Sequence, residues 1–263
     1  MRAVVMEARG GPEVLKLKEV ETPTPGPKEV LLRVKAAGLN HLDIWVRKGV
    51  ASPKLPLPHV LGADAAGVVE AVGPGVTAFK PGDEVVVNPG ISCGLCERCL
   101  KGEDNLCPRY EILGEHRWGS YAEGLVVPEA NLLPKPQGLS FVEAAAIPLT
   151  FLTAWQMVVD KLQVSPGEDV LVMAAGSGVS VAAIQIAKLF GARVIATVGS
   201  EEKLRKALEL GADEGVNYTH PDWFKEVRRL TGGKGADKVV DHTGALYFEG
   251  VIKATANGGK IAI

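Results

Sequence analysis

The sequence lacks the features that mark several large classes of protein. Its longest apolar stretches reach about ten residues, which is too short for a helix that crosses a bilayer. Lysine and arginine total 29 against 31 aspartates and glutamates, and the two signs are interleaved, so nothing predicts nucleic acid or membrane binding. The opening MRAVVMEARGG has neither the long apolar core nor the cleavage site of a secretory signal, so we expect a cytoplasmic protein.

Cysteine is absent from all but one short stretch. The four cysteines, Cys93, Cys96, Cys99 and Cys107, lie within NPGISCGLCERCLKGEDNLCP, residues 88–108. In a reducing compartment, clustered cysteines are more often metal ligands than disulfides. Seven residues precede the last cysteine, a longer gap than in the bacterial iron–sulfur signature. The stretch therefore indicates a metal lobe, with an empty reduced loop as the alternative.

The chain divides into two parts of different texture. Its 263 residues, 46% of them hydrophobic, suit two domains that each have a core. Residues 1–125 carry short β-type runs such as EVLLRVKAAG and DEVVVN, separated by glycine and proline, which predict a compact and mostly antiparallel barrel or sandwich. LPKPQGLS (133–140) has the composition of a connecting segment. We therefore place one domain at 1–125 and a linker with a second domain at 126–263.

From about residue 165, apolar runs alternate with helical patterns. This alternation predicts βαβ units, an α/β fold and a doubly wound parallel sheet of the Rossmann type. The chain ends inside the fifth strand, whereas such a fold usually has about six, so we expect a domain that is incomplete at its C-terminus. Strands are expected at 169–175, 192–198, 214–218, 237–244 and 260–263, and helices at 179–190, 201–210, 222–230 and 246–256.

A glycine-rich turn, VMAAGSGVSVAA (172–183), joins the first of these strands to the first helix. Glycines there let the backbone approach a pyrophosphate, and the helix N-terminus supplies free N–H groups. Gly176 and Gly178 form G-x-G, but the third glycine is missing, and Ser180 and Val181 stand where it is expected. The turn predicts dinucleotide binding, and the alternative is that the glycines only ease packing. The residues predicted to bind are Gly176, Ser177, Gly178 and Val179.

The end of the second strand bears on the choice of cofactor. An NAD site usually has an acidic residue there, which binds the ribose 2′-hydroxyl. This chain instead has Val198, Gly199 and Ser200, and Lys203 and Tyr218 can meet a 2′-phosphate. Charge matching favours NADP(H), with NAD(H) still possible, and we predict that Ser200, Lys203 and Tyr218 contact the cofactor. The alternative for Lys203 is a solvated helix face.

Together these segments resemble the medium-chain dehydrogenase/reductase superfamily over the whole chain. The resemblance rests on GVVEAVGPGV, PGDEVVV, GSYAE, GARVIAT and the cysteine stretch. It implies a GroES-like β-barrel catalytic domain, a Rossmann domain, a small-molecule substrate, and a homodimer or homotetramer when full length. The cysteine spacing resembles the family's structural zinc lobe, which implies one structural zinc on Cys93, Cys96, Cys99 and Cys107. Four thiolates in a closed tetrahedron suit a loop that cannot bury enough apolar area to hold itself.

Zinc alcohol dehydrogenases of this superfamily hold a second, catalytic zinc through a cysteine, a histidine and a third cysteine or carboxylate. The matching positions here are Asn40, Ala63 and Leu149. Alanine and leucine cannot ligate zinc, and an amide is a poor zinc ligand. Leu42 also replaces the hydroxyl that relays the alcohol's proton. GLNHLDIWVRKG, residues 38–49, instead resembles the zinc-free quinone oxidoreductase branch.

The predicted function is therefore hydride transfer from NADPH to quinones or to activated alkenes and carbonyls, without catalytic zinc. Asn40 is predicted to hydrogen-bond the substrate oxygen. Asp43 supports Asn40 or only caps a helix, and Thr153 contacts the nicotinamide end or only packs. One alternative is an alcohol dehydrogenase whose zinc site is rebuilt from nearby groups, and another is a non-enzymatic, cofactor-binding relative. The groups near Asn40 are His41, His59 and Asp64, whereas His116, His220 and His242 have no ligand partners at metal spacing and receive no role.

Overall fold

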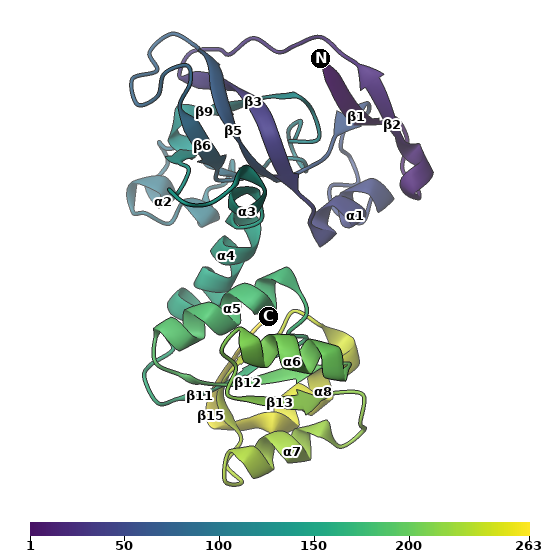
Figure 1. Cartoon of the computed structure of the whole chain (residues 1–263), viewed down its shortest axis with the longest axis vertical. Helices are drawn as coiled ribbons and strands as arrows, with labels where there is room; N and C mark the ends of the chain where they lie inside the picture. The colour runs from purple at the N-terminus through teal and green to yellow at the C-terminus, as the bar shows by residue number, and fades with distance from the viewer. The chain divides into compact units, whose positions relative to one another are not determined.

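The computed structural model describes all residues, Met1–Ile263, and the chain forms two compact units (Figure 1). They span Met1–Leu149 and Thr150–Ile263, so the division lies about 24 residues beyond the one at 125/126. The difference has a physical reason. The strands β9 (Gly124–Pro128) and β10 (Leu132–Pro134) pair with strands of the first unit and contribute Leu125, Val127 and Leu132 to its core.

The first unit is antiparallel, as the short runs and frequent turns predict. Its largest sheet has the order β10-β6-β5-β3-β9, and two smaller sheets have the orders β2-β1-β4 and β7-β8. The other strands are β1 (Arg2–Met6), β2 (Leu15–Glu19), β3 (Glu29–Gly38), β4 (His59–Val60), β5 (Asp64–Val72), β6 (Glu84–Val87), β7 (Gly90–Ile91) and β8 (Glu111–Ile112). The helices are α1 (His41–Lys48), α2 (Glu97–Leu100) and α3 (Phe141–Ala145), with 3-10 turns η1 (Pro12–Val14), η2 (Asp104–Leu106) and η3 (Glu129–Asn131).

The second unit contains a parallel sheet with strand order β13-β12-β11-β14-β15. β11, the first strand of this unit, is central, and the strand order reverses beside it, as in dinucleotide-binding folds. The predicted α/β class is confirmed. The strands are β11 (Asp169–Val172), β12 (Arg193–Val198), β13 (Glu214–Asn217), β14 (Ala236–Val240) and β15 (Thr255–Ala262). The helices are α4 (Pro148–Trp155), whose first two residues belong to the first unit, the π-helical segment η4 (Gln156–Lys161), α5 (Gly178–Leu189), α6 (Glu201–Glu209), α7 (Trp223–Leu230) and α8 (Ala245–Ala254).

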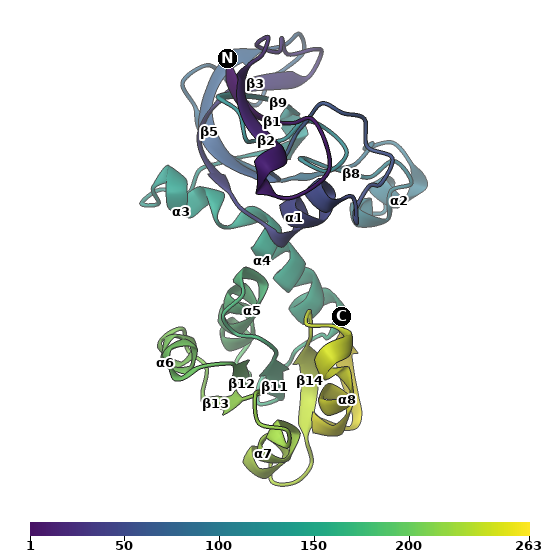
Figure 2. The ribbon, with the colours of Figure 1, turned by 90° about the vertical axis from the view of Figure 1, so that its right-hand side faces the viewer.

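Helices cover both faces of this sheet (Figure 2). Strand side chains alternate between two apolar clusters, because successive residues of a strand point to opposite faces. Val170, Val172 and Val194 pack against α5, α6 and η4 on one face. Leu171, Met173 and Ile195 face α7 and α8 on the other. Burial on both faces explains why these strands are continuous apolar runs.

The prediction for the last helix and strand was wrong in its boundaries. The helix expected to end at 256 ends at Ala254, and the strand expected from 260 begins at Thr255. Gly258, with φ +79°, and the adjacent Gly259 let the strand bulge, so that Ala236 pairs with Thr255 but Lys238 pairs with Lys260. Glycine-rich residues inside a bulged strand carry little strand signal.

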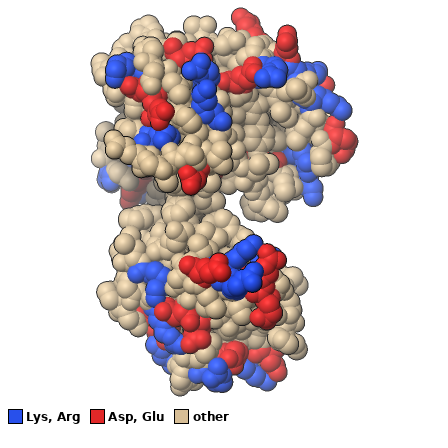
Figure 3. Space-filling view, viewed as in Figure 1, with Lys and Arg blue, Asp and Glu red and all other residues tan.

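Charges of both signs are interspersed on the face of the molecule shown in Figure 3. Many of them form ion pairs along one helix, such as Glu202 with Lys206 and Glu249 with Lys253. None of the helices combines the length and apolar character needed to cross a membrane.

Candidate functional site

The four cysteines come together at one point of the first unit. Their Sγ atoms all lie within 4.8 Å of one another, and Cys107 is buried. The Sγ atom of Cys99 lies 3.8 Å from that of Cys93 and 3.4 Å from that of Cys96. A tetrahedral zinc with Zn–S bonds of about 2.3 Å needs sulfurs about 3.8 Å apart. Donor type, number and spacing therefore fit a closed zinc site.

Backbone N–H groups point at these sulfurs. The amides of Cys93 and Arg109 donate to the Cys107 Sγ at 3.4 and 3.3 Å. The amides of Leu95 and Cys96 lower the pKa of Cys93 to about 5. Hydrogen bonds of this kind orient the sulfurs and favour the thiolate, which is the form that binds metal.

Asn40 sits at the N-terminus of α1 and points into a buried polar network. Its backbone N–H donates to the Asp43 carboxylate at 2.7 Å, which is one half of a capping box. Its side-chain Nδ2 donates to Asp64 Oδ2 at 2.9 Å. An amide nitrogen carries two hydrogens, and this bond uses one. The second is available to a substrate oxygen.

Asp43 ties α1 to two other segments. One carboxylate oxygen accepts from the Tyr121 hydroxyl at 2.7 Å as well as from Asn40, and the other accepts from the Gly62 N–H at 3.1 Å. Burial and the hydrogen bond to Asp43 raise the pKa of Tyr121, so the phenol stays protonated and donates. The interpretation that Asp43 caps the helix is thus confirmed. That Asp43 supports Asn40 in catalysis stays a prediction.

Asp64 accepts hydrogen bonds from residues at two of the three positions that ligate zinc in alcohol dehydrogenases. It begins β5 and is 1% exposed. Its carboxylate accepts from Asn40 and from the Leu149 backbone N–H, the latter at 2.9 Å. Ala63, at the third position, is fully buried. A hydrogen-bonded carboxylate therefore organises these residues.

Burial raises the pKa of Asp64 from 3.8 to about 6, although the bonds from Asn40 and Leu149 oppose the shift. Between those two pH values the folded protein holds a proton that the unfolded chain has released, so this group favours folding more as the pH falls. Relative to Asp64→Asn, which does not titrate, the wild-type free energy of unfolding should rise by on the order of 2–3 kcal/mol from about pH 7 to about pH 4. Denaturant melts of both proteins across this range measure it, and a constant difference would mean that Asp64 titrates normally.

The histidines proposed for a rebuilt zinc site have other partners. His59 is buried, its Nε2 lies 3.1 Å from the Gly114 carbonyl oxygen, and burial lowers its pKa. His41 is exposed and packs edge-to-face on Trp45, with ring centroids 4.9 Å apart. The four cysteines form the one group of three or more His, Cys, Asp and Glu side chains placed to share a metal ion.

The glycine-rich turn of the second unit has the form that dinucleotide binding requires. Ser177 N-caps α5, and its Oγ accepts from the Ser180 N–H at 3.2 Å. A Cβ on Gly178 would lie 2.8 Å from Thr150 Cγ2, and one on Gly176 would lie 3.1 Å from Lys203 Cδ. Both glycines are exposed, so a phosphate can approach the backbone where side chains would block it. Val179 is half-buried and packs against the core, so its backbone is the part that faces the turn.

The residues predicted around a 2′-phosphate also gather at one place. Ser200 N-caps α6, and its Oγ accepts from the Lys203 N–H at 3.4 Å. A Cβ on Gly199 would lie 3.0 Å from the Tyr218 hydroxyl oxygen. Lys203 is exposed, forms no ion pair and lies along Gly176. The arrangement places one cation and two hydroxyls at the carboxyl end of β12. Thr153, by contrast, lies on the exposed side of α4, and its contact with a nicotinamide stays a prediction.

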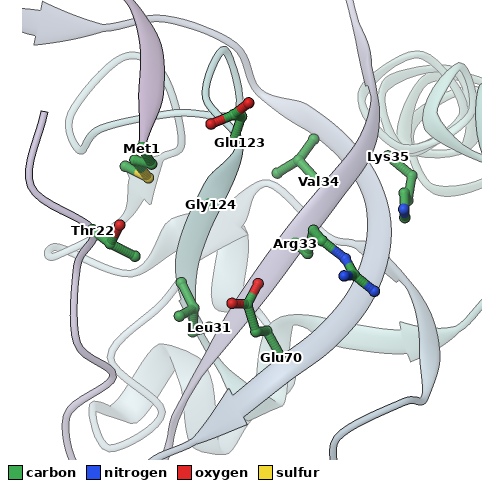
Figure 4. A pocket seen from close by; sticks show the side chains of 9 residues that line it. All are labelled: Met1, Thr22, Leu31, Arg33, Val34, Lys35, Glu70, Glu123 and Gly124. Atoms are coloured by element: carbon green, nitrogen blue, oxygen red, sulfur yellow. The ribbon is translucent and has the colours of Figure 1, made fainter. Parts of the chain in front are cut away.

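A pocket of about 370 Å³ opens on the sheet of the first unit (Figure 4). Charged side chains of both signs line it, including Arg33 from β3 and Glu70 from β5. None of the predicted site residues lines this pocket, so it has no part in the site described above.

Sequence reasoning missed the roles of four residues in these sites, and it named Asp64 only as a possible zinc ligand. Tyr121 and Asp64 hold the Asn40 region, and Ser180 and His242 hold the glycine-rich turn. His242 was given no role, yet its Nε2 lies 2.8 Å from the Ser177 Oγ and 2.7 Å from the Ser180 Oγ. One signal was available, because His242 follows β14 and the carboxyl ends of neighbouring parallel strands meet at one edge.

Comparison with known proteins agrees with this geometry. Residues 26–137 match a family described as "Alcohol dehydrogenase GroES-like domain", and residues 178–263 match one described as "Zinc-binding dehydrogenase". A solved structure of an NAD-dependent alcohol dehydrogenase is 83% identical, with a TM-score of 0.99 over 100% of this chain and 77% of its own. Human (Homo sapiens) quinone oxidoreductase is 32% identical over 100% of this chain and 72% of its own. An NAD-dependent alcohol dehydrogenase of Sulfurisphaera tokodaii is 39% identical over 92% and 71%.

A parallel dinucleotide sheet together with an antiparallel GroES-like unit defines a nicotinamide-dependent dehydrogenase. The chain belongs to the medium-chain dehydrogenase/reductase superfamily, as its sequence motifs imply. It is an NAD(P)-dependent oxidoreductase, and the non-enzymatic alternative is not supported.

Proposed function

We propose that this enzyme reduces quinones or activated alkenes and carbonyls with NADPH and uses no catalytic metal. The observation that carries the proposal is the Asn40–Asp64–Leu149 network. Two of the three metal-ligand positions carry alanine and leucine, which offer no side-chain donor atom. The third carries an amide held by a buried carboxylate.

Asn40 would bind the substrate oxygen. The bond to Asp64 fixes the orientation of the amide, so its other N–H meets the oxygen without reorganisation as negative charge develops there. Asp43 and Tyr121 hold the backbone at Asn40 in place. The reduced nicotinamide supplies the hydride, so the protein needs no covalent nucleophile.

The glycine-rich turn would hold the pyrophosphate, with Gly176, Ser177, Gly178 and Val179 presenting backbone N–H groups. Ser200, Lys203 and Tyr218 would receive the adenosine ribose and its 2′-phosphate. Lys203 favours NADPH over NADH as the cofactor, because it is a cation without an ion pair beside the turn. The name of the 83%-identical relative specifies NAD, so NADH is the alternative cofactor.

Lys203→Ala should raise the KM for NADPH by about tenfold and leave the KM for NADH within about twofold, because only NADPH carries the phosphate that pairs with the lysine. Lys206→Ala is the matched control, since Lys206 is on the same helix and pairs with Glu202. Initial rates with each cofactor measure the effect. Equal losses for both cofactors would remove the case for a 2′-phosphate site at Lys203.

We also propose that Cys93, Cys96, Cys99 and Cys107 hold one structural zinc. With all four positions taken by thiolates, a metal here has no open position for substrate. Its role would be to hold the segment between β7 and β8, whose leucines Leu95, Leu100 and Leu106 are exposed and bury little apolar surface.

A substrate panel tests the proposed reaction. Purified enzyme with NADPH should reduce several quinones and enones, and with NAD⁺ or NADP⁺ it should oxidise primary and secondary alcohols far more slowly. The alternative is an alcohol dehydrogenase, which the names of two relatives favour. Faster alcohol oxidation than quinone reduction would establish that alternative.

A further inference from the structure

Ser180 lies directly before Val181, which stands at the position of the missing third glycine, and its side chain is fully hydrogen-bonded. It is fully buried in α5, where its Oγ donates to the Met173 carbonyl oxygen at 2.6 Å. A hydroxyl has a single proton, so this bond leaves the Ser180 oxygen only as an acceptor. The serine is therefore tolerated in this buried place because its hydroxyl is paired.

The second partner of Ser180 is His242, whose Nε2 lies 2.7 Å from the Ser180 Oγ. Because the serine proton is already committed to Met173, this contact requires the proton on Nε2. Desolvation of the ring lowers the pKa of His242, so the imidazole is neutral at neutral pH and its single N–H is the one on Nε2.

The loop that carries His242 is itself fixed. Asp241, which is fully buried, accepts at Oδ1 from the Thr243 N–H at 2.7 Å and from the Thr243 hydroxyl at 2.6 Å. β14, which precedes this loop, pairs with β11, which precedes the glycine-rich turn. Neighbouring strand ends thus bring the imidazole to the turn.

This arrangement leaves the Ser177 hydroxyl able to donate to a bound phosphate. Its Oγ accepts from the Ser180 N–H and lies 2.8 Å from His242 Nε2, so it shares the single Nε2–H with the Ser180 Oγ. Its own hydroxyl lies 3.1 Å from the Ser180 Oγ and can donate to it. A phosphoryl oxygen is a stronger acceptor than a serine hydroxyl that already accepts from an imidazole. When a dinucleotide binds, the Ser177 proton can therefore turn to the phosphate.

We propose that His242 is a positioning residue of the dinucleotide turn: its Nε2–H holds the Ser180 hydroxyl and so leaves the Ser177 hydroxyl to donate to a phosphoryl oxygen. The inference concerns cofactor binding and does not depend on which substrate is reduced. It makes Ser180 and His242 a matched pair that supports a glycine-rich turn lacking its third glycine.

Quenching of protein fluorescence by NADPH tests the proposal through the cofactor Kd. His242→Ala should weaken binding by about tenfold. His242→Gln should stay within about threefold of wild type, because the glutamine side-chain nitrogen reaches the place of Nε2 and donates there. In a cycle with Ser180→Ala, the two changes together should cost little more than His242→Ala alone. Saturating NADPH should restore kcat to within about twofold, which separates positioning from catalysis.

Three results would overturn the proposal: wild-type Kd in His242→Ala, a Kd for His242→Gln as weak as that for His242→Ala, or additive effects in the cycle. Thermal melts of each variant check folding, and His242→Gln keeps the test decisive if the alanine variant is unstable. If the Kd values follow the expected pattern but the enzyme does not reduce quinones, the proposed reaction is wrong and this inference about cofactor binding still holds.

Discussion

Asn40→Ala should lower kcat/KM for a quinone substrate by about 10²–10³-fold, the usual cost of removing one donor that stabilises a developing oxyanion. The Kd for NADPH should not change, because the proposal assigns Asn40 to the substrate oxygen and the cofactor phosphates to the glycine-rich turn. Steady-state kinetics and fluorescence titration measure the two effects separately.

The variant also changes the N-cap residue of α1, and its control must change an N-cap residue too. Ser140 N-caps α3 with a capping box through Glu143, so Ser140→Ala should lose a similar ~1 kcal/mol of stability while activity stays within about twofold. If Asn40→Ala keeps kcat/KM within about threefold of wild type, or if Ser140→Ala loses as much activity, the proposed role of Asn40 is wrong.

Cys107→Ser should abolish metal binding and open the segment between β7 and β8. Cys107 is the most buried of the four cysteines and receives two backbone N–H bonds, so its loss removes a ligand and uncouples the loop. Structural zinc supplies folding free energy directly. We therefore expect the free energy of local unfolding of this segment to fall by several kcal/mol, with rapid tryptic cleavage after Arg98 or Lys101. Limited proteolysis with metal analysis measures both.

Asn105→Ser is the control for this experiment, because Asn105 is exposed in the same segment and holds no sulfur. It should keep its metal and its resistance to trypsin. A Cys107→Ser protein that retains a full complement of zinc and stays resistant would contradict a four-cysteine site.

The sequence predicts the fold well where periodicity is strong. The buried strands β11 and β12 and the helices α5 and α6 lie close to their predicted positions, because apolar spacing indicates these elements locally. The predicted boundary at 125/126 cuts through β9 and leaves β10 in the stretch predicted as linker and second domain, because pairing with β3 and β6 depends on distant residues. The predicted form of β15 was too short, because the glycines at its bulge give little strand signal.

The sites show the same contrast. Cysteine spacing predicts the metal cluster, because all four ligands lie in one short segment. Asn40 can be predicted from its local motif. Asp64 and Tyr121, which hold it in place, lie 24 and 81 residues away in sequence. Their roles depend on how β5 and the segment before β9 fold back against α1, which no local pattern records. Ser180 and His242 are 62 residues apart and meet for a similar reason.

The central claim is that the metal in this enzyme is structural and the reaction needs none. The most direct test is the zinc content of purified protein that actively reduces quinones, measured by mass spectrometry together with the Asn40→Ala and Cys107→Ser variants. We predict about one zinc per chain in wild type and in Asn40→Ala, and none in Cys107→Ser. About two per chain in wild type, with the second lost in Asn40→Ala together with activity, would contradict the account and favour a zinc alcohol dehydrogenase.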